Sequence, residues 1–417
     1  MSKHILIIGS GVIGLSVAYY LVREGHRVTI IERAAPEDEG CSYRNAGMIV
    51  PSHFIPLAAP GMVALGLKWM WNPESPFYIK PRLNADLLSW GWRFYRAATS
   101  AHVNRAAPLL RELSLASRSC FEALAALPEW EFGLVKKGLL MLCKSEHTLA
   151  EEAQTAERAK ALGIPAQVLD AKQTAALEPN VRMDIAGAVY FPKDCHLSPS
   201  RFMGALRRQL GEAGVRFEWR TEVTGWHAHG RQIETVLTSQ GEKAADEFVL
   251  CGGSWSPLAV RDLGLRVPMQ AGKGYSVTLP KPRQLPEICS IFTEARVAVT
   301  PIDGALRFGG TMEIAGLNSQ INPARVQGII KAVPRYYPDF KPDDFRDLPV
   351  WCGLRPCSPD GLPYLGRTNA YSNLSLATGH AMMGLSLAPI TGKLLAEILQ
   401  NQKPSIDISL LHPDRYG

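Results

Sequence analysis

The sequence predicts an α/β fold: a helix-covered parallel sheet, interrupted by an inserted α+β part built on a mostly antiparallel sheet. Two observations support this prediction. The chain opens on a strand–turn–helix–strand pattern and closes on a second glycine-rich strand-to-helix turn at Thr378-Gly-His380. Between these ends, residues 265–345 alternate apolar and polar side chains in the way that antiparallel strands do.

The opening segment has the spacing of a dinucleotide-binding turn. An apolar run at residues 4–8 is typical of a buried parallel strand, and Gly9, Gly11 and Gly14 follow it in the pattern G-x-G-x-x-G. Gly9 permits the tight turn, and Gly11 lets the backbone approach a pyrophosphate. Gly14 lets the helix pack closely on the sheet. The sequence therefore predicts a Rossmann-type unit at the N-terminus.

A helix and an acidic residue complete this unit. The helix from Val12 to about Glu24 directs its first amides at phosphate oxygens. Glu32 ends the next strand, 18 residues after Gly14, where it can accept hydrogen bonds from a ribose diol. The alternative is a glycine-rich turn in an ordinary α/β unit, but the strand, helix and acid together favour dinucleotide binding.

The remaining elements follow from apolar spacing and from stop signals. Residues 35–53 are expected to be a loop. Helices are predicted at 83–127, at 146–162 (ended by Gly163 and Pro165), at 198–214 (with Ser198 as cap and Pro199 in the first turn) and as a closing helix to about 400. Strands are predicted at 28–32, 138–143, 186–191, 215–219, 222–227, 232–238, 246–251 and 373–377.

Length and motif order suggest a divided nucleotide domain. A chain of 417 residues suits two domains. Because the glycine motifs lie at both ends, we expect a nucleotide-binding domain over 1–53, 186–262 and 346–417, with a substrate-binding domain over 54–185 and 263–345. Only one G-x-G-x-x-G occurs, so the electron donor is expected to be a small molecule rather than a nicotinamide cofactor.

Composition restricts the partners. The formal net charge is +6 with no run of Lys and Arg, so nucleic acid is not expected, although anionic substrates or membrane surfaces remain compatible. The eight cysteines are scattered without a C-x-x-C pair, which predicts neither a metal site nor a redox dithiol. No signal-peptide pattern stands at the start, so a cytoplasmic setting is expected.

One apolar segment allows two interpretations. No apolar stretch of about 20 residues predicts a spanning helix. Residues 54–71 are nevertheless apolar, with a single Lys and two Trp near the end. This segment is either a helix lying in a membrane surface or a hydrophobic lid, or it is a buried helix with its connecting loop.

A series of motifs supports a family resemblance. After the opening motif come Ser42-x-x-Asn45-Ala-Gly47, Gly252-Gly-x-Trp255, Gly353-Leu-Arg355-Pro356, Pro359-Asp-Gly-Leu-Pro363 and Thr378-Gly-His380-x-x-x-Gly384. In this order they resemble the D-amino-acid oxidase (DAO) family of FAD-dependent enzymes over essentially the whole chain. Pro51, Pro56-x-Ala-Ala-Pro-Gly61, Lys68-Trp-Met70 and Lys273-Gly-Tyr-Ser276 look most like the bacterial D-amino acid dehydrogenases. Glycine and sarcosine oxidases look less similar in the middle.

The resemblance implies a glutathione-reductase-like domain that binds FAD. It assigns the pyrophosphate to Gly9, Gly11, Val12, Ile13 and Gly14, the adenosine to Glu32 and Arg33 with Val223, and the phosphate and flavin face to Ser42, Arg44, Asn45, Ala46 and Gly47. Gly252, Trp255, Gly353, Gly379, Met382, Met383 and Gly384 are expected around the rest of the cofactor. Sarcosine oxidases attach FAD through a cysteine where this chain has Gly353, so non-covalent FAD is expected.

The resemblance also implies oxidative deamination of an amino acid. Arg355 is expected to hold the substrate carboxylate, the alternative being a structural arginine paired with a core acid. Tyr275 is expected to cover the substrate or donate to its carboxylate, the alternative being a packed strand aromatic. His380 presents its backbone amide to the flavin, with a structural or a chemical imidazole. His53 lines the pocket or is a loop histidine.

The expected reaction moves a hydride from Cα to flavin N5 and needs a neutral amine. No general base is required if the amine binds neutral or loses its proton on binding. The imine would hydrolyse to a 2-oxo acid, or stay cyclic for a proline. Expected substrates are D-alanine-like amino acids or D-proline and hydroxyproline, with a quinone or respiratory-chain acceptor. The alternatives are a glycine- or sarcosine-type oxidase that uses O2, and an RNA-modifying flavoprotein, for which no basic domain is present. The oligomeric state stays open.

Overall fold

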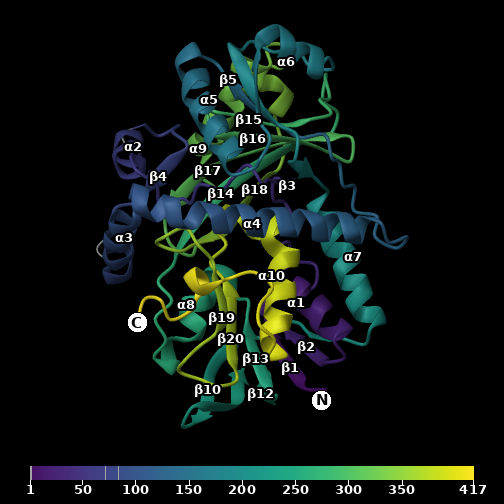
Figure 1. Cartoon of the computed structure of the whole chain (residues 1–417), viewed down its shortest axis with the longest axis vertical. Helices are drawn as coiled ribbons and strands as arrows, with labels where there is room; N and C mark the ends of the chain where they lie inside the picture. Colours follow the sequence, from purple (N-terminus) through teal and green to yellow (C-terminus); the bar gives the residue numbers. More distant parts are fainter. Residues whose placement is uncertain (1, 71, 83) are drawn as a thin grey trace.

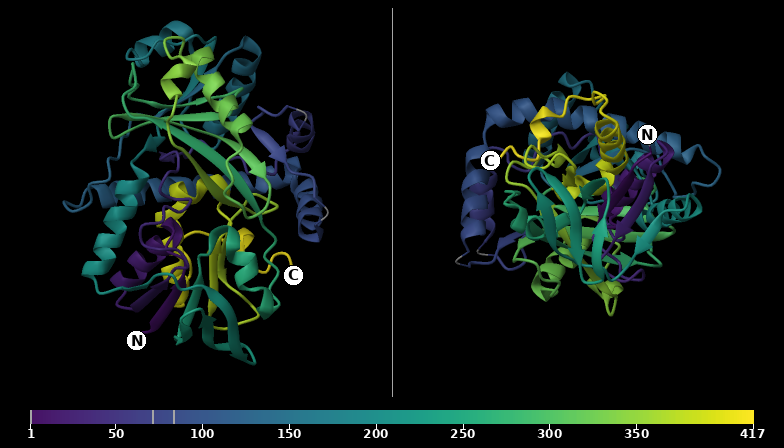
Figure 2. Two further views of the ribbon diagram at one scale, coloured as in Figure 1. Left: turned by 180° about the vertical axis from the view of Figure 1, so that it is seen from behind. Right: turned by 90° about the horizontal axis from the view of Figure 1, so that it is seen from below.

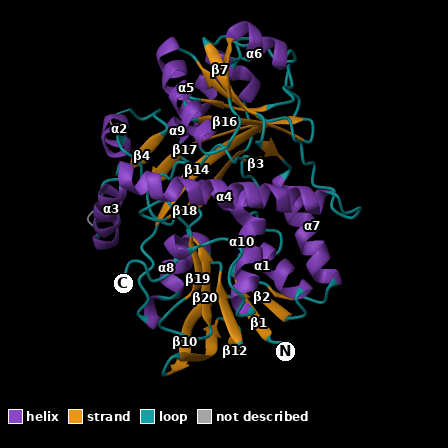
Figure 3. Ribbon diagram, in the orientation of Figure 1, coloured by secondary structure: helices purple, strands orange, loops and turns teal. Residues whose placement is uncertain are grey.

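The protein consists of two sheet-based halves joined by long helices (Figure 1). The computed structural model describes residues 2–70, 72–82 and 84–417. Met1, Trp71 and Leu83, where predicted segments begin or end, lie outside the described residues. Seen from behind, the strands separate into the same two halves (Figure 2, left). Figure 3 colours the same strands and helices by type in the orientation of Figure 1.

The first half holds a six-stranded sheet with β1 near its centre. Neighbouring strands are parallel, except that the edge strand pairs antiparallel. In spatial order the strands are β19 (Tyr364–Arg367), β20 (Leu374–Thr378), β13 (Glu247–Leu250), β1 (His4–Ile8), β2 (Arg27–Ile31) and β9 (Arg216–Glu218). The carboxyl ends of β1, β13 and β20 lead into Gly9, Gly252 and Gly379, so the glycine turns of distant segments meet at one edge of the sheet.

Helices cover this sheet and link it to the other half. They are α1 (Val12–Arg23), α7 (Pro199–Glu212) and α10 (Gly384–Leu399), and α4 (Ser100–Ala125) crosses between the two halves (Figure 1). α10 packs against both α1 and α4. A Cβ on Gly392 would lie 2.5 Å from the Ser16 carbonyl oxygen, so α1 and α10 approach closely. Ala381–Leu399 is apolar and long enough to cross a membrane by composition, but 67% of it is buried in this core.

The second half holds a nine-stranded, mostly antiparallel sheet. In order the strands are β18 (Val350–Cys357), β14 (Gln270–Leu279), β17 (Ala305–Ile314), β16 (Val297–Ile302), β15 (Cys289–Phe292), β5 (Leu139–Cys143), β7 (Gly187–Phe191) and β6 (Gln167–Asp170), with β4 (Phe77–Ile79) beside β17. Its helices are α5 (Glu146–Ala161), α6 (Ala171–Leu177) and α9 (Pro323–Tyr336). The parallel pairs within it are β5 with β15 and β4 with β17.

Smaller elements complete the chain. A three-stranded sheet contains β10 (Val223–His229), β11 (Gln232–Thr238) and β12 (Gly241–Ala244), and β3 (Met48–Ile49) pairs with β8 (Cys195–His196). The short helices α2 (Met62–Trp69), α3 (Ala85–Ala97) and α8 (Ser256–Ala259) flank the two halves. The predicted helix over 83–127 is two helices, because Thr99 caps α4 by accepting a hydrogen bond from the His102 amide.

Two expectations need correction. The region 265–345, expected to form antiparallel sheet, also contains the helix α9, whose first amides are capped by Asn322 with Pro323 in the first turn. The strands β7 and β18 were expected in the nucleotide-binding domain, but they pair with β5 and β14 in the large sheet. The predicted domain boundaries at residues 186 and 346 therefore come before strands that belong to the large sheet. The sequence of a single strand does not determine which strand it pairs with.

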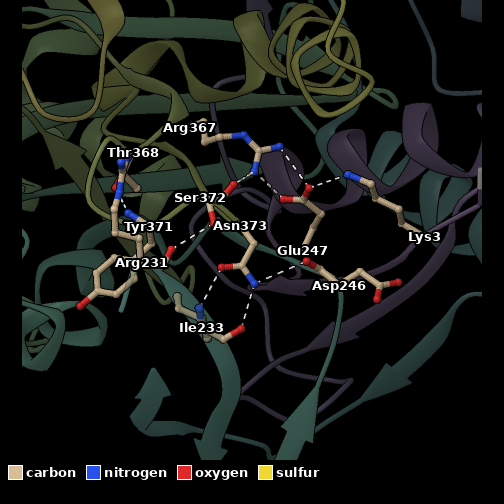
Figure 4. A network of polar contacts seen from close by, with 10 residues as sticks. All are labelled: Lys3, Arg231, Ile233, Asp246, Glu247, Arg367, Thr368, Tyr371, Ser372 and Asn373. Atoms are coloured by element: carbon tan, nitrogen blue, oxygen red, sulfur yellow. Dashed lines mark hydrogen bonds and ion pairs between the residues drawn. The ribbon is translucent and has the colours of Figure 1, made fainter. Parts of the chain in front are cut away.

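A polar network locks the amino ends of the first sheet (Figure 4). Glu247 pairs with Lys3 at 2.7 Å and with Arg367 at 2.7 Å. The Asn373 side chain bonds both the N–H and the carbonyl of Ile233 at 2.9 Å, which ties the β11 strand to β20. Since ligands of such sheets bind beyond the carboxyl ends, this network at the opposite end is structural.

Candidate active site

One large cavity of about 1200 Å³ lies at the carboxyl ends of the nucleotide sheet. Its wall combines the β1 turn and the loop 38–46 with β14, β18, α2 and α3 from the other half. Most ligand pockets measure roughly 300–1,000 Å³. The cavity therefore has room for an extended cofactor together with a small substrate.

The glycine turn forms a cradle that side chains would fill. Gly9 has φ of +107°, and a Cβ there would lie 2.6 Å from the Cys251 carbonyl oxygen. A Cβ on Gly14 would lie 2.0 Å from the carbonyl oxygen of Gly9. At Gly11 the nearest atom is Ser42 Oγ at 3.7 Å, so its cavity side is open. The α1 helix has no acidic residue in its first turn, which leaves a positive helix end for a pyrophosphate.

Glu32 is oriented at the cavity wall by three donors. Its carboxylate accepts hydrogen bonds from the Ser10 N–H at 2.8 Å, the Ser10 hydroxyl at 3.1 Å and the Ala34 N–H at 3.1 Å. A carboxylate has about four acceptor positions, so one remains for a ribose hydroxyl. Arg33 lies 3.7 Å above the Trp255 ring, and both side chains line the cavity with Val223. These residues fit the adenosine end of a dinucleotide.

The loop after β2 is held by its own hydrogen bonds. Ser42 Oγ accepts from the Val12 amide at 3.1 Å, and Asn45 Oδ1 accepts from the Gly47 amide at 2.9 Å. The Arg44 Nε pairs with Glu39, and Arg44 also lines the cavity. Ala46 also lines the wall.

The other predicted cofactor residues divide into two groups. Ile13, Gly252, Gly353, Met382, Met383 and Gly384 line the cavity, whereas Gly14, Gly47 and Gly379 stand behind its wall. In the second group each glycine removes a clash. A Cβ on Gly47 would lie 2.4 Å from the Leu197 carbonyl oxygen, and one on Gly379 would lie 2.8 Å from the Tyr364 ring. α10 starts at Gly384 without a side-chain cap, so its positive end also opens toward the cavity.

Arg355 is a cation that β18 contributes to the cavity's second half, where Arg296 also lines the wall. The Arg355 Nη1 donates to the Thr311 carbonyl at 2.6 Å, and no carboxylate among the described residues pairs with it. Burial lowers its pKa, against the influence of the nearby Cys41 and Cys357. The guanidinium lies directly over Gly274, where a Cβ would approach it to 2.2 Å. A half-buried guanidinium without a carboxylate partner in the described residues is suited to a carboxylate ligand.

Tyr275 faces the other side of the same strand. Its ring is buried beside α9, and its hydroxyl donates to Glu313 at 2.6 Å and accepts from the Asn322 amide at 3.2 Å. Side chains alternate along a strand, so Gly274 and Arg355 share one face while Tyr275 takes the opposite one. Tyr275 is among the residues that line the cavity, but its hydroxyl is held by Glu313 and is not brought to Arg355, so its role toward a substrate stays a prediction.

The two candidate histidines differ in their surroundings. His380 is buried, its Nε2 lies 3.0 Å from Thr391 Oγ1, its Nδ1 has no partner among the described residues, and burial lowers its pKa to about 3. His53 lines the cavity, and burial and the charge of Arg296 lower its pKa to about 4. Both imidazoles are therefore neutral near pH 7.

The sequence did not single out three other parts of the wall. Trp90 and Phe94, stacked at 5.1 Å on α3, and Met312 on β17 make the region near Arg355 apolar. Gly274 belongs to the motif Lys273-Gly-Tyr-Ser276, but its role, to leave room for the Arg355 guanidinium, depends on the pairing of β14 with β18. No group of three or more potential metal ligands occurs in the described part of the chain.

Comparison with known proteins agrees with this geometry. The family described as FAD dependent oxidoreductase (DAO) matches residues 4–398. The D-amino acid dehydrogenase of Bradyrhizobium diazoefficiens is 33% identical over 99% of both chains, and that of Agrobacterium fabrum is 33% identical over 99% of this chain and 100% of its own. Glycine oxidase from Geobacillus kaustophilus has the same fold, with a TM-score of 0.80 at 23% identity over 99% of both chains. L-proline dehydrogenase from P. horikoshii aligns with a TM-score of 0.74 at 17% identity over 100% of this chain and 98% of its own.

Proposed function

The chain belongs to the DAO family of FAD-dependent oxidoreductases, and on that premise we propose that it is a dehydrogenase of small D-amino acids. The protein is an FAD-dependent amino acid oxidoreductase, and the cofactor is non-covalent FAD. The proposal adds the handedness of the substrate, its size and the acceptor. Its main support is the similarity over 99% of this chain to D-amino acid dehydrogenases, together with the uncompensated guanidinium of Arg355 in an apolar region of the FAD cavity.

Different residues of the cavity have different roles in the proposed reaction. Bound FAD supplies a two-electron acceptor for the hydride that leaves Cα. Arg355 holds the substrate carboxylate through paired N–H donors, which fixes Cα relative to the cofactor. The positive end of α10 favours negative charge on the part of the cofactor that lies beside it. Trp90, Phe94 and Met312 keep water from the reacting atoms.

We propose D-alanine-like amino acids or D-proline and hydroxyproline as substrates. The apolar wall of Trp90 and Phe94 suits an aliphatic side chain or a ring rather than a charged group. The imino product is expected to hydrolyse to a 2-oxo acid and ammonia, or to remain a cyclic imine when the substrate is a proline.

We further propose that electrons leave to a quinone or another respiratory acceptor, with the protein at the cytoplasmic face of a membrane. The helices α2 and α3 line the cavity and also expose large apolar side chains, with exposed fractions of 59% for Leu67, 65% for Leu88, 62% for Trp92 and 60% for Tyr95. We call these four residues the α2–α3 surface. It suits shallow insertion into a bilayer beside the cavity.

The test of the reaction is anaerobic bleaching of the flavin absorbance by D- and L-amino acids, glycine, sarcosine and the hydroxyprolines. Bleaching by D-isomers alone would support the proposal and identify the substrate. Bleaching by glycine or sarcosine, with peroxide released in air, would instead indicate an oxidase that uses O2. Bleaching by none of them would refute amino acid oxidation.

The membrane part is tested separately. Co-sedimentation with anionic vesicles should fall for the double variant Leu88→Ser with Trp92→Ser, while turnover with a soluble dye stays unchanged. Leu177→Ser in α6, also an exposed leucine at 39%, is the matched control. Equal sedimentation of both variants would contradict a role for the α2–α3 surface.

A further inference from the structure

A buried acid and a serine lie behind His53 at the cavity wall. Asp194, in the loop between β7 and β8, is fully buried. Its carboxylate accepts hydrogen bonds from the Ser52 N–H at 3.1 Å and the Ser52 hydroxyl at 2.5 Å. Ser52 Oγ in turn lies 3.0 Å from Nδ1 of His53, which lines the cavity. The three side chains form one continuous hydrogen-bonded chain from the interior to the cavity.

The hydrogen bonds among His53, Ser52 and Asp194 have a single consistent set of donors and acceptors when Asp194 is ionised. A carboxylate only accepts, so Ser52 donates its one hydroxyl hydrogen to Asp194, and its oxygen then accepts from Nδ1–H of His53. The hydrogen therefore stands on Nδ1, and Nε2 carries a lone pair. Nε2 of His53 makes no hydrogen bond to the described residues. It is not a fully buried atom either, so it is open to the cavity that His53 lines.

The proposed reaction needs a proton acceptor that the residues discussed so far do not provide. Amino acids carry an ammonium group near neutral pH, and its proton must leave before the nitrogen lone pair can assist hydride transfer. Arg355 only donates, and the Tyr275 hydroxyl is bonded to Glu313. The imidazole of His380 contacts Thr391 through Nε2, and its Nδ1, unpartnered among the described residues, is buried away from the open space of the cavity. His53 is left as the open acceptor in the wall.

We propose that His53, Ser52 and Asp194 form a proton relay that takes the ammonium proton from the bound amino acid. This inference rests on the proposed function. The substrate N–H bond breaks as its proton joins Nε2 of His53. The Nδ1 proton passes to Ser52 Oγ, and the Ser52 hydroxyl proton passes to Asp194 Oδ2. His53 ends neutral in its other tautomer, Ser52 keeps one proton, and no electrons move through the relay.

The surroundings of Asp194 suit the end of such a relay. Burial raises the pKa of Asp194 to about 7, although the Ser52 hydrogen bonds and the charge of Arg118 in α4 lower it. The neighbouring thiols of Cys195 in β8 and Cys289 in β15 stay protonated, because burial raises the pKa of each. An acceptor that titrates near the working pH is what general base catalysis requires.

The surroundings of His53 suit a transmitting role. Burial and the Arg296 guanidinium, in the turn between β15 and β16, lower the pKa of His53 to about 4. The imidazole therefore does not store the extra proton and passes it inward instead. His53 touches the substrate and is the catalytic residue, whereas Ser52 and Asp194 act through it.

Asp194→Asn tests the relay because it reverses the donor and acceptor roles in the hydrogen bonds among residue 194, Ser52 and His53, while the side chain keeps its shape. The amide N–H donates to Ser52 Oγ, Ser52 donates to Nδ1, and Nε2 then carries the hydrogen and no longer accepts. The rate of anaerobic flavin reduction near neutral pH is expected to fall about 100-fold or more. It should recover as the pH rises and the free substrate loses its amine proton unaided. Ser52→Ala should behave alike, and Ser52→Thr, which keeps the hydroxyl, should retain the wild-type profile.

Other outcomes overturn the relay. An equal loss at every pH would show that Asp194 only holds the 50–53 loop, and wild-type profiles in both the Asn and Ala variants would refute the relay directly. ¹⁵N spectra of histidine-labelled protein give a second readout, with His53→Gln assigning the signal. Well above the pKa of Asp194, His53 should carry its hydrogen on Nδ1 in the wild type and on Nε2 in Asp194→Asn, and the same tautomer in both would refute the mechanism.

The relay and the proposed function fail in distinguishable ways. If no amino acid bleaches the wild-type flavin, the proposed function is wrong and the relay as written falls with it. If D-amino acids bleach the flavin of the wild type, but Asp194→Asn has the same pH profile and the same His53 tautomer as the wild type, only the relay is wrong.

Discussion

Adding one methyl group at Gly274 should disable substrate binding without unfolding the protein. A Cβ at this position would lie 2.2 Å from the Arg355 nitrogens, whereas ordinary contact begins at 3.4 Å. The guanidinium in Gly274→Ala must therefore retreat by about 1 Å. Hydrogen bonds to charged groups contribute about 1.5–3 kcal/mol, so losing the carboxylate contact corresponds to a roughly 10- to 150-fold weaker Kd.

The assay is anaerobic titration of the flavin spectrum with substrate or a carboxylate inhibitor. Gly309→Ala on the neighbouring strand is the matched control, because its Cβ would have no neighbour closer than 3.8 Å. Both variants should keep FAD, since neither glycine belongs to the dinucleotide turn. Wild-type affinity in Gly274→Ala would refute the assignment of Arg355 to the substrate carboxylate, and equal weakening in both variants would point to general damage of the sheet.

Three further predictions concern other parts of the molecule. Gly14→Ala places a Cβ 2.0 Å from a backbone oxygen, so the protein should purify with little FAD, measured by its flavin absorbance. The pKa of the buried Asp360 carboxyl lies below its ordinary value, because the charge and hydrogen bonds of Arg415 outweigh the effect of burial, which raises it. The Asp360–Arg415 pair therefore stabilises the protein above about pH 4, and this stabilisation is lost as the pH falls through the folded-state pKa of Asp360. Asp360→Asn should cost about 3–5 kcal/mol at pH 7 and flatten this acid limb in urea titrations, and an unchanged limb would contradict the pairing. Thr391→Val should cost about 1–3 kcal/mol of stability while leaving kcat unchanged, whereas a large loss of kcat would show that the His380 imidazole takes part in the chemistry.

Asp360 also explains a motif that the sequence showed without a reason. Arg415 bonds both carboxylate oxygens, at 2.8 and 3.0 Å, and His102 Nε2 lies 2.8 Å from the Asp360 carbonyl oxygen. The Pro359-Asp-Gly turn thus ties the C-terminal tail and α4 to the strand that follows Arg355. Its role is to hold these segments in place rather than to contact the substrate.

The apolar segment at 54–71 falls between its two interpretations. Within the described residues, α2 buries only Gly66 completely, so it is not a core helix. It lines the cavity, and both Leu67 and Lys68 are exposed. A hydrophobic stretch of this length does not reveal which partner it meets, because the same side chains suit a core, a lid or a bilayer.

Local patterns were enough to predict the nucleotide unit. The strand before Gly9, the helix α1 and the acid Glu32 each depend on neighbours within a few residues, and the structure contains all of them. Most other helices and strands were also predicted within a few residues, because caps, stop signals and apolar spacing are local properties. The single G-x-G-x-x-G and the motif order likewise sufficed for the family and the cofactor.

The tertiary structure alone decided which side chains meet in the cavity. Sequence placed Gly274 next to Tyr275, but only the pairing of β14 with β18 put the Arg355 guanidinium over the glycine and turned the tyrosine to the opposite face. Ser52 and Asp194 are 142 positions apart, so no local pattern connects them. Side-chain meetings of this kind depend on strand register and on the packing of distant segments, which each residue's own neighbours in sequence do not specify.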